Sequence, residues 1–205
     1  MKVFQVGFGK CGTSSLHQFF LNSGYRSIHW GGGELAKSIS RNVNNRNYIL
    51  DGLDDYDFYT DMQNVTWESI IHAYIYYEYF YYQVEKSKFI FNTRPVERWI
   101  ISIINHTHMF ERYASCLNKT DFMGVLKELS NHYYNHSRMI MDFFKDKKDR
   151  FIVFDISKDH IKKVIDFLPE FDLNCKYWEF HNVTDNRNRG FLERFHELTK
   201  TASGS

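Results

Sequence analysis

The stretch GFGKCGTSS, residues 7–15, follows a short apolar run and decides how the rest of the chain is interpreted. Gly7 and Gly12 have the spacing of the glycines in a nucleotide-binding phosphate loop, but Thr13 stands where that pattern has its lysine. The lysine is Lys10, two residues before the second glycine. A glycine-rich turn between a strand and a helix exposes backbone N–H groups, and the helix adds its positive end. The stretch therefore predicts an anion site with its cation inside the loop.

Outward from this loop, short β-branched or aromatic runs alternate with segments of helical period, which is typical of a parallel sheet covered by helices. We expect strands at residues 3–7, 25–30, 89–92 and 150–156, with weaker extended segments at 48–53 and 57–62. We expect helices at residues 13–22, 31–42, 67–84, 96–106, 121–144, 157–168 and 191–199. The predicted fold is α/β, a three-layer parallel sheet flanked by helices, with the architecture of P-loop nucleoside-triphosphate hydrolases.

The size and composition of the chain fit one compact domain. With 205 residues and 43% hydrophobic content, we expect a single domain over residues 1–200 and a disordered tail at 201–205. Lys+Arg 26 against Asp+Glu 25 leaves a net charge of +1, so no overall field attracts nucleic acid. The short N-terminal apolar run predicts neither a signal peptide nor a membrane span. Three scattered cysteines without a CxxC pair favour a reducing, cytoplasmic location and no zinc.

The segment YIYYEYFYYQV ends a run, residues 67–84, in which aromatic and apolar residues occupy nearly every face. Interleaved Arg and Lys, which stacking on nucleic-acid bases requires, are missing from it. We interpret it as one long helix that packs in the core and in a homodimer.

A second motif follows the strand at residues 89–92. Arg94 lies just beyond the strand, and Pro95 opens the next helix in the position that proline tolerates. Ser102 follows Arg94 by eight residues, and Arg98 lies one turn from Arg94 on the same face. The motif thus places a guanidinium and a hydroxyl at the end of a central strand.

The segments VGFGKCGTSSL and FIFNTRPVERWIISIINH together resemble the two signature motifs of the sulfotransferases, and most closely those of the small bacterial-type enzymes. The resemblance implies 3′-phosphoadenosine 5′-phosphosulfate as donor, adenosine 3′,5′-bisphosphate as product, and no metal. It also implies two sets of donor-binding residues. The 5′-phosphosulfate would be held by Gly9, Lys10, Cys11, Gly12, Thr13, Ser14 and Ser15. The 3′-phosphate would be held by Arg94 and Ser102.

The position of Lys10 agrees with sulfuryl transfer. When the S–O bond breaks, negative charge grows on the oxygen that bridged sulfur and phosphorus. An ammonium group already placed beside that oxygen stabilises the transition state more than the ground state.

Two residues are candidates for the base that accepts the proton of the acceptor. His29 ends the second expected strand, and its ordinary pKa lies close to neutral pH, so we prefer it. Asp61 would need its pKa raised by burial, and it could instead orient a histidine or bind a cationic acceptor. His106 lies four residues beyond Ser102 and is expected to face the same cleft.

Two features leave alternatives open. Arg187 and Arg189 lie in a polar loop that either covers the 3′-phosphate, as a late basic loop does in larger sulfotransferases, or is a solvated surface loop. We expect the acceptor to be a hydroxyl or amine of a small molecule or carbohydrate, but nothing in the sequence distinguishes a sugar, a lipid, a peptide tyrosine or a small metabolite.

Two other functions are alternatives to the transferase. A P-loop kinase or NTPase would use Asp155 as its Mg²⁺ partner, but it also requires a lysine at position 13. A noncatalytic assembly module would use the aromatic segment and leave the loop without a role. The presence of Lys10, Arg94 and Ser102 together favours the transferase.

Overall fold

A computed structural model describes residues 1–119 and 121–180 of the chain. Its centre is a five-stranded sheet in the order β2-β3-β1-β6-β7, in which every neighbouring pair of strands is parallel. The strands are β1 (Val3–Gln5), β2 (Ser27–His29), β3 (Phe58–Thr60), β6 (Lys88–Thr93) and β7 (Phe151–Asp155). The predicted α/β fold with a parallel sheet is confirmed.

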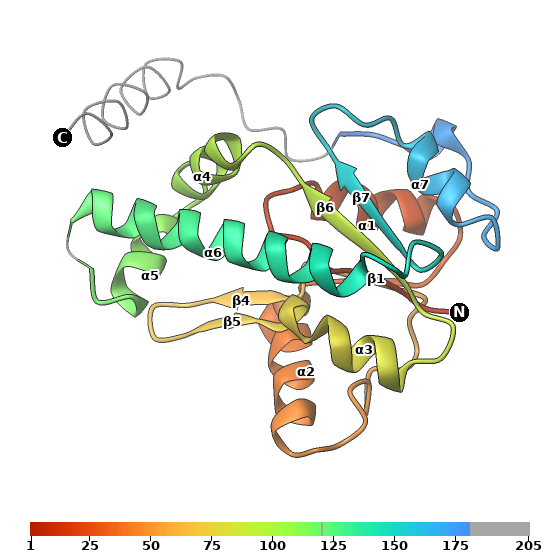
Figure 1. The fold of residues 1–205 in the computed structure, drawn as a ribbon, viewed down its shortest axis with the longest axis horizontal. Helices are drawn as coiled ribbons and strands as arrows, with labels where there is room; N and C mark the ends of the chain where they lie inside the picture. The colour runs from red at the N-terminus through yellow and green to blue at the C-terminus, as the bar shows by residue number, and fades with distance from the viewer. Residues whose placement is uncertain (120, 181–205) are drawn as a thin grey trace.

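Helices cover both faces of this sheet, as Figure 1 shows. On one face lie α2 (Glu34–Asn44), α3 (Tyr77–Gln83), α4 (Val96–Ile104), α5 (Met109–Cys116) and the long α6 (Phe122–Phe144). On the other lie α1 (Thr13–Asn22) and α7 (Lys162–Phe167). Three short 3-10 turns complete the elements: η1 (Gly31–Gly33), η2 (Ala73–Tyr76) and η3 (Cys175–Tyr177). Even α6, with its 23 residues, lacks the sustained apolar stretch that a bilayer-spanning helix needs, and this holds for all described helices.

The strands supply both cores by alternating their side chains. In β1, Val3 packs with α1 and α7, while Phe4 packs with the residues of the opposite face. In β6, Ile90 packs in the same core as Val3, and Phe89 packs in the same core as Phe4. Because successive side chains of a strand point to opposite faces, a sheet buried on both sides reads as a nearly continuous apolar run. This is why the run at residues 89–92 was a strong strand signal.

The order of the strands creates a crevice beside β1. The chain leaves β1 through α1 toward β2 at one edge of the sheet, whereas it leaves β6 through α4 toward β7 at the other edge. Ligands of open α/β sheets bind at the carboxyl ends of two neighbouring strands whose connections diverge in this way. The loop at residues 7–15 follows β1, and Arg94 follows β6, so the topology brings the two motifs to one crevice.

The helix predicted over residues 67–84 is wrong. Residues 63–72 form a hairpin of β4 (Gln63–Val65) and β5 (Ile70–His72), and only α3 at the end of the segment is an α-helix. The Thr66 hydroxyl accepts hydrogen bonds from the backbone N–H groups of Glu68 and Ser69, which closes a side-chain turn that competes with helix formation. The predicted core role is confirmed for Tyr74 and Phe80, which are fully buried.

Three smaller differences concern element boundaries. Residues 48–53 form turns, because the buried Asn42 amide donates to the backbone carbonyls of Ile49 and Asp51. The helix expected from residue 157 begins at Lys162, since the Ser157 hydroxyl donates to Asp155 and caps no helix. The sequence analysis also missed α5. The helix expected at residues 191–199 and the tail at 201–205 lie outside the described residues.

Candidate functional site

A cavity of about 690 Å³ lies at the carboxyl ends of the central strands. Both sequence motifs contribute to its wall, together with residues from the β4–β5 hairpin, from α5 and from the segment after β7. The lining residues are Lys10, Gly12, Thr13, Ser14, Ser15, His29, Trp30, Asp61, Gln63, Val65, Arg94, Arg98, Ser102, His106, Met109, Arg112, Ile156, Ser157 and Phe180. The cavity thus has the size of an ordinary small-ligand site.

The loop after β1 is held from behind by residues of β6 and α4. The buried Asn92 amide accepts a hydrogen bond from the Gly7 N–H (3.0 Å) and donates to the carbonyls of Phe8 (2.9 Å) and Cys11 (3.1 Å). Trp99 Nε1 donates to the Gly9 carbonyl at 2.9 Å. The carbonyls of the loop are therefore satisfied on the side away from the cavity.

The end of the loop carries a glycine for conformational and steric reasons. Gly12 caps α1 with φ of 80°, a left-handed conformation, and a side chain there would collide with Ile156. Because Gly12 has no side chain, it offers no side-chain cap to the first N–H groups of α1, which have no acceptor within the helix. Thr13, Ser14 and Ser15 form the first turn of α1 and line the cavity. This end of the cavity can bind an oxyanion.

Three non-glycine residues with positive φ line the cavity. They are Lys10 (φ 64°) in the loop after β1, and Trp30 (φ 53°) and Asp61 (φ 51°), which directly follow β2 and β3. Non-glycine residues adopt this conformation at a cost of about 1–3 kcal/mol each, and they cluster at functional sites. The strain marks these three residues as candidates for function.

Lys10 is a partly buried cation inside the cavity. Burial lowers the pKa of its ammonium group, the nearby carboxylate of Asp61 raises that pKa, and the guanidinium of Arg94 lowers it further. Among the described residues, Lys10 forms no ion pair with a carboxylate in direct contact. Its charge is available to an anionic ligand.

His29 and Asp61 lie side by side in the same wall. His29 Nε2 is 3.7 Å from Asp61 Oδ2 and 3.4 Å from Ser14 Oγ. The Thr60 hydroxyl donates to the Ile28 carbonyl at 3.0 Å, so at its 3.1 Å contact with His29 Nδ1 it accepts. The hydrogen-bond network therefore assigns the proton of neutral His29 to Nδ1 and leaves the Nε2 lone pair facing Asp61 and the cavity.

Burial moves the two pKa values in opposite directions. Burial, aided by the charges of His17 and Lys10, lowers the pKa of His29 to about 4. Burial raises the pKa of Asp61 to about 7, although Lys10 opposes this change. Because burial disfavours the charged form of either group, the reason for preferring His29 as the base no longer holds. Asp61 has the pKa that suits proton transfer near neutral pH.

The second motif lines the opposite part of the wall. Arg94 lies just after β6, and its Nη1 donates a hydrogen bond to the Lys10 carbonyl at 3.0 Å. Its Nε is buried without a partner among the described residues. Ser102 is buried in α4 and lines the cavity one turn beyond Arg98. His106, beyond the end of α4, lines it as well, as expected.

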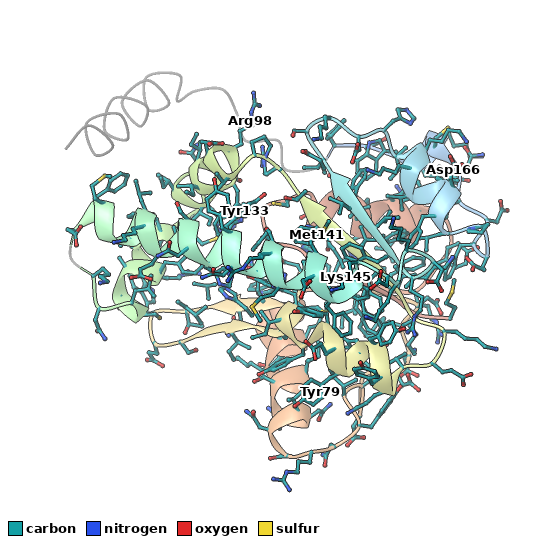
Figure 2. The ribbon with its side chains drawn as sticks, viewed as in Figure 1. Tyr79, Arg98, Tyr133, Met141, Lys145 and Asp166 are labelled. Carbon is teal, nitrogen blue, oxygen red and sulfur yellow. The ribbon has the colours of Figure 1, made fainter. Side chains whose placement is uncertain are left out.

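Tyr133 supports the backbone between Asn92 and Arg94. Figure 2 shows it midway along α6, and its hydroxyl contacts Thr93 Oγ1 and the Arg94 carbonyl at 2.5 Å each. Arg98 is exposed and projects outward from α4 in the same view. Arg94 is therefore held in place, whereas Arg98 lies at the rim of the cavity.

Some predicted site residues lie elsewhere. Gly9 does not line the cavity, and the fully buried Cys11 side chain packs in the core. Arg187 and Arg189 lie outside the described residues. Asp155, the Mg²⁺ partner in the kinase interpretation, is not in the cavity wall; its carboxylate accepts from the Ser157 hydroxyl and lies 3.4 Å from Lys158 Nζ. In the part of the chain that the structure describes, no three histidine, cysteine or acidic side chains group as metal ligands.

Sequence reasoning missed several residues of this site. Asn92 carried a signal, because a polar residue inside a buried strand requires hydrogen-bond partners. No sequence signal pointed to Gln63 or Arg112, because they lie on the β4–β5 hairpin and on α5, which were not predicted. Trp30 was noted only as the end of a strand.

A comparison with protein families places the chain. The family model described as the sulfotransferase domain matches residues 2–180, which include both motifs and every described residue of the cavity. No curated protein matches the chain.

Proposed function

Because the chain belongs to the sulfotransferase domain family, we propose that it transfers a sulfuryl group from 3′-phosphoadenosine 5′-phosphosulfate to a hydroxyl or amine of a small molecule or carbohydrate. The observation that carries this proposal is that Lys10 and Arg94 line one cavity and are joined by a hydrogen bond. The two motifs therefore act on one ligand.

The residues of the cavity fit the donor at both of its charged ends. The Gly12 turn, the hydroxyls of α1 and Lys10 suit a phosphosulfate, because they combine backbone donors, a helix N-terminus and one cation. Arg94 and Ser102 suit a phosphate, because a guanidinium binds phosphate oxygens in a fork. Within residues 1–119 and 121–180 the buried Nε of Arg94 has no hydrogen-bond partner, so it can donate to a phosphate oxygen. When bound, the donor supplies an activated sulfuryl group.

The protein contributes a preplaced positive charge. The Lys10 ammonium would lie beside the oxygen on which negative charge grows as transfer proceeds. Because the Lys10 carbonyl is bonded to Arg94, the backbone of the lysine does not have to reorganise during the reaction.

The protein also contributes a proton acceptor. We assign this role to Asp61, whose pKa of about 7 leaves a substantial fraction ionised at neutral pH and makes the carboxylate a stronger base than an exposed one. His29 is assigned a positioning role toward Ser14, because its Nδ1 donates to Thr60 and its Nε2 can then accept from the Ser14 hydroxyl at 3.4 Å. The acceptor hydroxyl would lie between Asp61 and Lys10.

The decisive experiment is a comparison of two ligands by calorimetry. Adenosine 3′,5′-bisphosphate should bind tightly without Mg²⁺, and Arg94→Ala should weaken that binding by at least tenfold. ATP with Mg²⁺ should bind far more weakly. Tighter binding of ATP with Mg²⁺ than of the bisphosphate would overturn the proposal in favour of a kinase, and binding of neither would favour an assembly module.

A further inference from the structure

The cavity has a second cationic wall, formed by the β4–β5 hairpin and α5. Arg112 of α5 lines the cavity, and its Nη1 donates to the Val65 carbonyl at 3.4 Å. Its guanidinium carbon lies 6.0 Å from the centre of the Trp67 ring. Its Nε is buried and has no partner among the described residues. Arg112 is thus a partly buried arginine whose guanidinium can donate further hydrogen bonds.

The charges around the cavity are unbalanced. Its lining contains four cations, Lys10, Arg94, Arg98 and Arg112, but only one acidic residue, Asp61. Within the described residues, no carboxylate oxygen lies within 4.0 Å of any of the four cationic groups. Burying unpaired charge is costly, so such a wall is built for anionic ligands.

Arg112 faces the same space as the proposed catalytic lysine. Burial lowers the pKa of His106, and Lys10 and Arg112 both lower it further. His106 therefore lies within electrostatic reach of both cations, although they come from elements 102 residues apart in the chain, 112 minus 10.

Arg112 is nevertheless separate from the residues assigned to the donor. Lys10 belongs to the loop after β1 and Arg94 to the end of β6, whereas Arg112 is attached to β4 through the Val65 carbonyl. The edge of β4 connects Arg112 to the proposed base. Gln63 and Val65, alternate residues of β4, line the cavity, and Asp61 lines it just before the strand, across a turn in which the Gln63 N–H donates to the Asp61 carbonyl at 2.8 Å.

The span along this edge suits a small acceptor. Val65 follows Asp61 by four residues, and because even a fully extended chain advances only about 3.3 Å per residue, the two residues are at most about 13 Å apart. An acceptor lying along it would place one end at Asp61 and Lys10 and the other at Arg112.

We propose that the acceptor carries an oxyanion, a carboxylate or sulfate ester, that Arg112 binds while the hydroxyl to be sulfated lies at Asp61. This inference rests on the proposed function, which defines the donor end of the cavity. A guanidinium binds a carboxylate or sulfate through two parallel hydrogen bonds, so Arg112 would select anionic acceptors and fix their orientation. The acceptor class is then a hydroxylated organic anion.

The test measures binding of matched probes to the protein saturated with adenosine 3′,5′-bisphosphate. The probe pairs are 4-hydroxyphenylacetate and its amide, glucuronate and glucose, and glucose 6-sulfate and glucose. In at least one pair the anionic probe should bind at least tenfold more tightly. Arg112→Gln should reduce that ratio to about one, and Arg112→Lys should retain part of it.

The control variant is Arg138→Ala, which removes an exposed arginine of α6 that does not line the cavity and should change nothing. Bisphosphate affinity should stay within twofold in Arg112→Gln, which also shows that this variant is folded. Equal affinity of the wild-type protein for both members of every pair would overturn the inference. So would a loss of bisphosphate affinity in Arg112→Gln with the probe ratio unchanged, because Arg112 would then serve the donor.

The two failures can be told apart. If the wild-type protein binds no bisphosphate, the proposed function fails. The selectivity of the free protein for the anionic probes, and its loss in Arg112→Gln, would still decide the role of Arg112.

Discussion

Arg94 holds the backbone of Lys10 through a hydrogen bond of 3.0 Å from Nη1 to the lysine carbonyl, although 84 residues separate the two in sequence. Arg94 itself is fixed by the Tyr133 hydroxyl, which contacts its carbonyl. A change at Arg94 should therefore affect both the affinity for the donor and the position of the catalytic charge.

Arg94→Lys tests whether the planar fork of Arg94 matters beyond its charge. The lysine keeps the positive charge but cannot bond the Lys10 carbonyl and a phosphate at once. We expect bisphosphate affinity to fall by at least tenfold and kcat to fall as well, measured by calorimetry and by transfer of labelled sulfate. Arg138→Lys, at an exposed position of α6 outside the cavity lining, is the matched control and should change either quantity by less than threefold. Wild-type behaviour of Arg94→Lys would show that charge alone suffices.

Lys10→Ala tests the proposed stabilisation of the leaving oxygen. Removing one preorganised charge typically lowers kcat by about 10²–10³-fold. Bisphosphate binding should weaken much less than transfer, because the stabilised charge develops only during the reaction. Circular dichroism should show a folded protein, and Lys37→Ala, at a half-buried position of α2 outside the cavity lining, should leave kcat unchanged. If Lys10→Ala turned over like the wild type, Lys10 would have no part in the chemistry.

The pH dependence of kcat/KM identifies the base. A base acts in its deprotonated form, so activity rises with pH through the pKa of that base. If Asp61 is the base, the rise of kcat/KM on the acidic side of the profile, its acidic limb, should have its midpoint near pH 7, since the pKa of Asp61 is about 7. If His29 is the base, the limb should lie near pH 4, because the pKa of His29 is about 4. Asp61→Asn should abolish the limb near pH 7 and lower kcat strongly while bisphosphate still binds.

The same two groups should affect stability in opposite directions. Between about pH 4 and pH 7 the folded protein keeps the Asp61 proton that the unfolded chain has lost, so this group makes stability fall as pH rises. Between about pH 4 and pH 6.5 the unfolded chain binds a proton at His29 that the folded protein does not, so this group makes stability rise with pH. Relative to the wild type, Asp61→Asn should gain stability as pH increases from 4 to 7, measured by urea unfolding at a series of pH values. A constant difference between the two proteins across this range would contradict the raised pKa of Asp61.

Asn92→Leu should destabilise the fold and detach the loop. It removes one acceptor and two donor bonds and takes away the Asn92 partner of the buried Gly7 N–H and Cys11 carbonyl, whereas the Phe8 carbonyl still accepts from the Cys11 N–H at 3.3 Å. Each buried unsatisfied group costs about 1–3 kcal/mol, so we expect the free energy of unfolding to fall by about 2–6 kcal/mol. Asn92→Asp is the matched variant, because a carboxylate can accept from Gly7 but cannot donate to the two carbonyls. A loss below about 1 kcal/mol for the leucine variant would show that the loop holds its shape without Asn92.

Local patterns in the sequence determined the parallel sheet, the loop and the second motif. Side chains alternate along a strand and glycines permit close turns whatever the rest of the chain does, so residues 3–7, 89–92 and 7–15 were interpretable directly. The spacing of Arg94 and Ser102 likewise depends only on the geometry of one strand end and one helix. These signals were sufficient to predict the fold, and the resemblance of the two motifs to those of the sulfotransferases implied one donor site for Lys10, Arg94 and Ser102.

Tertiary structure decided the rest, because it depends on contacts between segments far apart in the chain. The turn at Thr66 and pairing with β5 placed Gln63 in the wall of the cavity, where the sequence only showed a polar stretch before an aromatic run. The pKa values of His29 and Asp61 are set by burial beneath several elements, which no local pattern reports. Arg112 is an ordinary helix arginine in the sequence, and it gains a function only because α5 packs against the hairpin and turns it into the cavity.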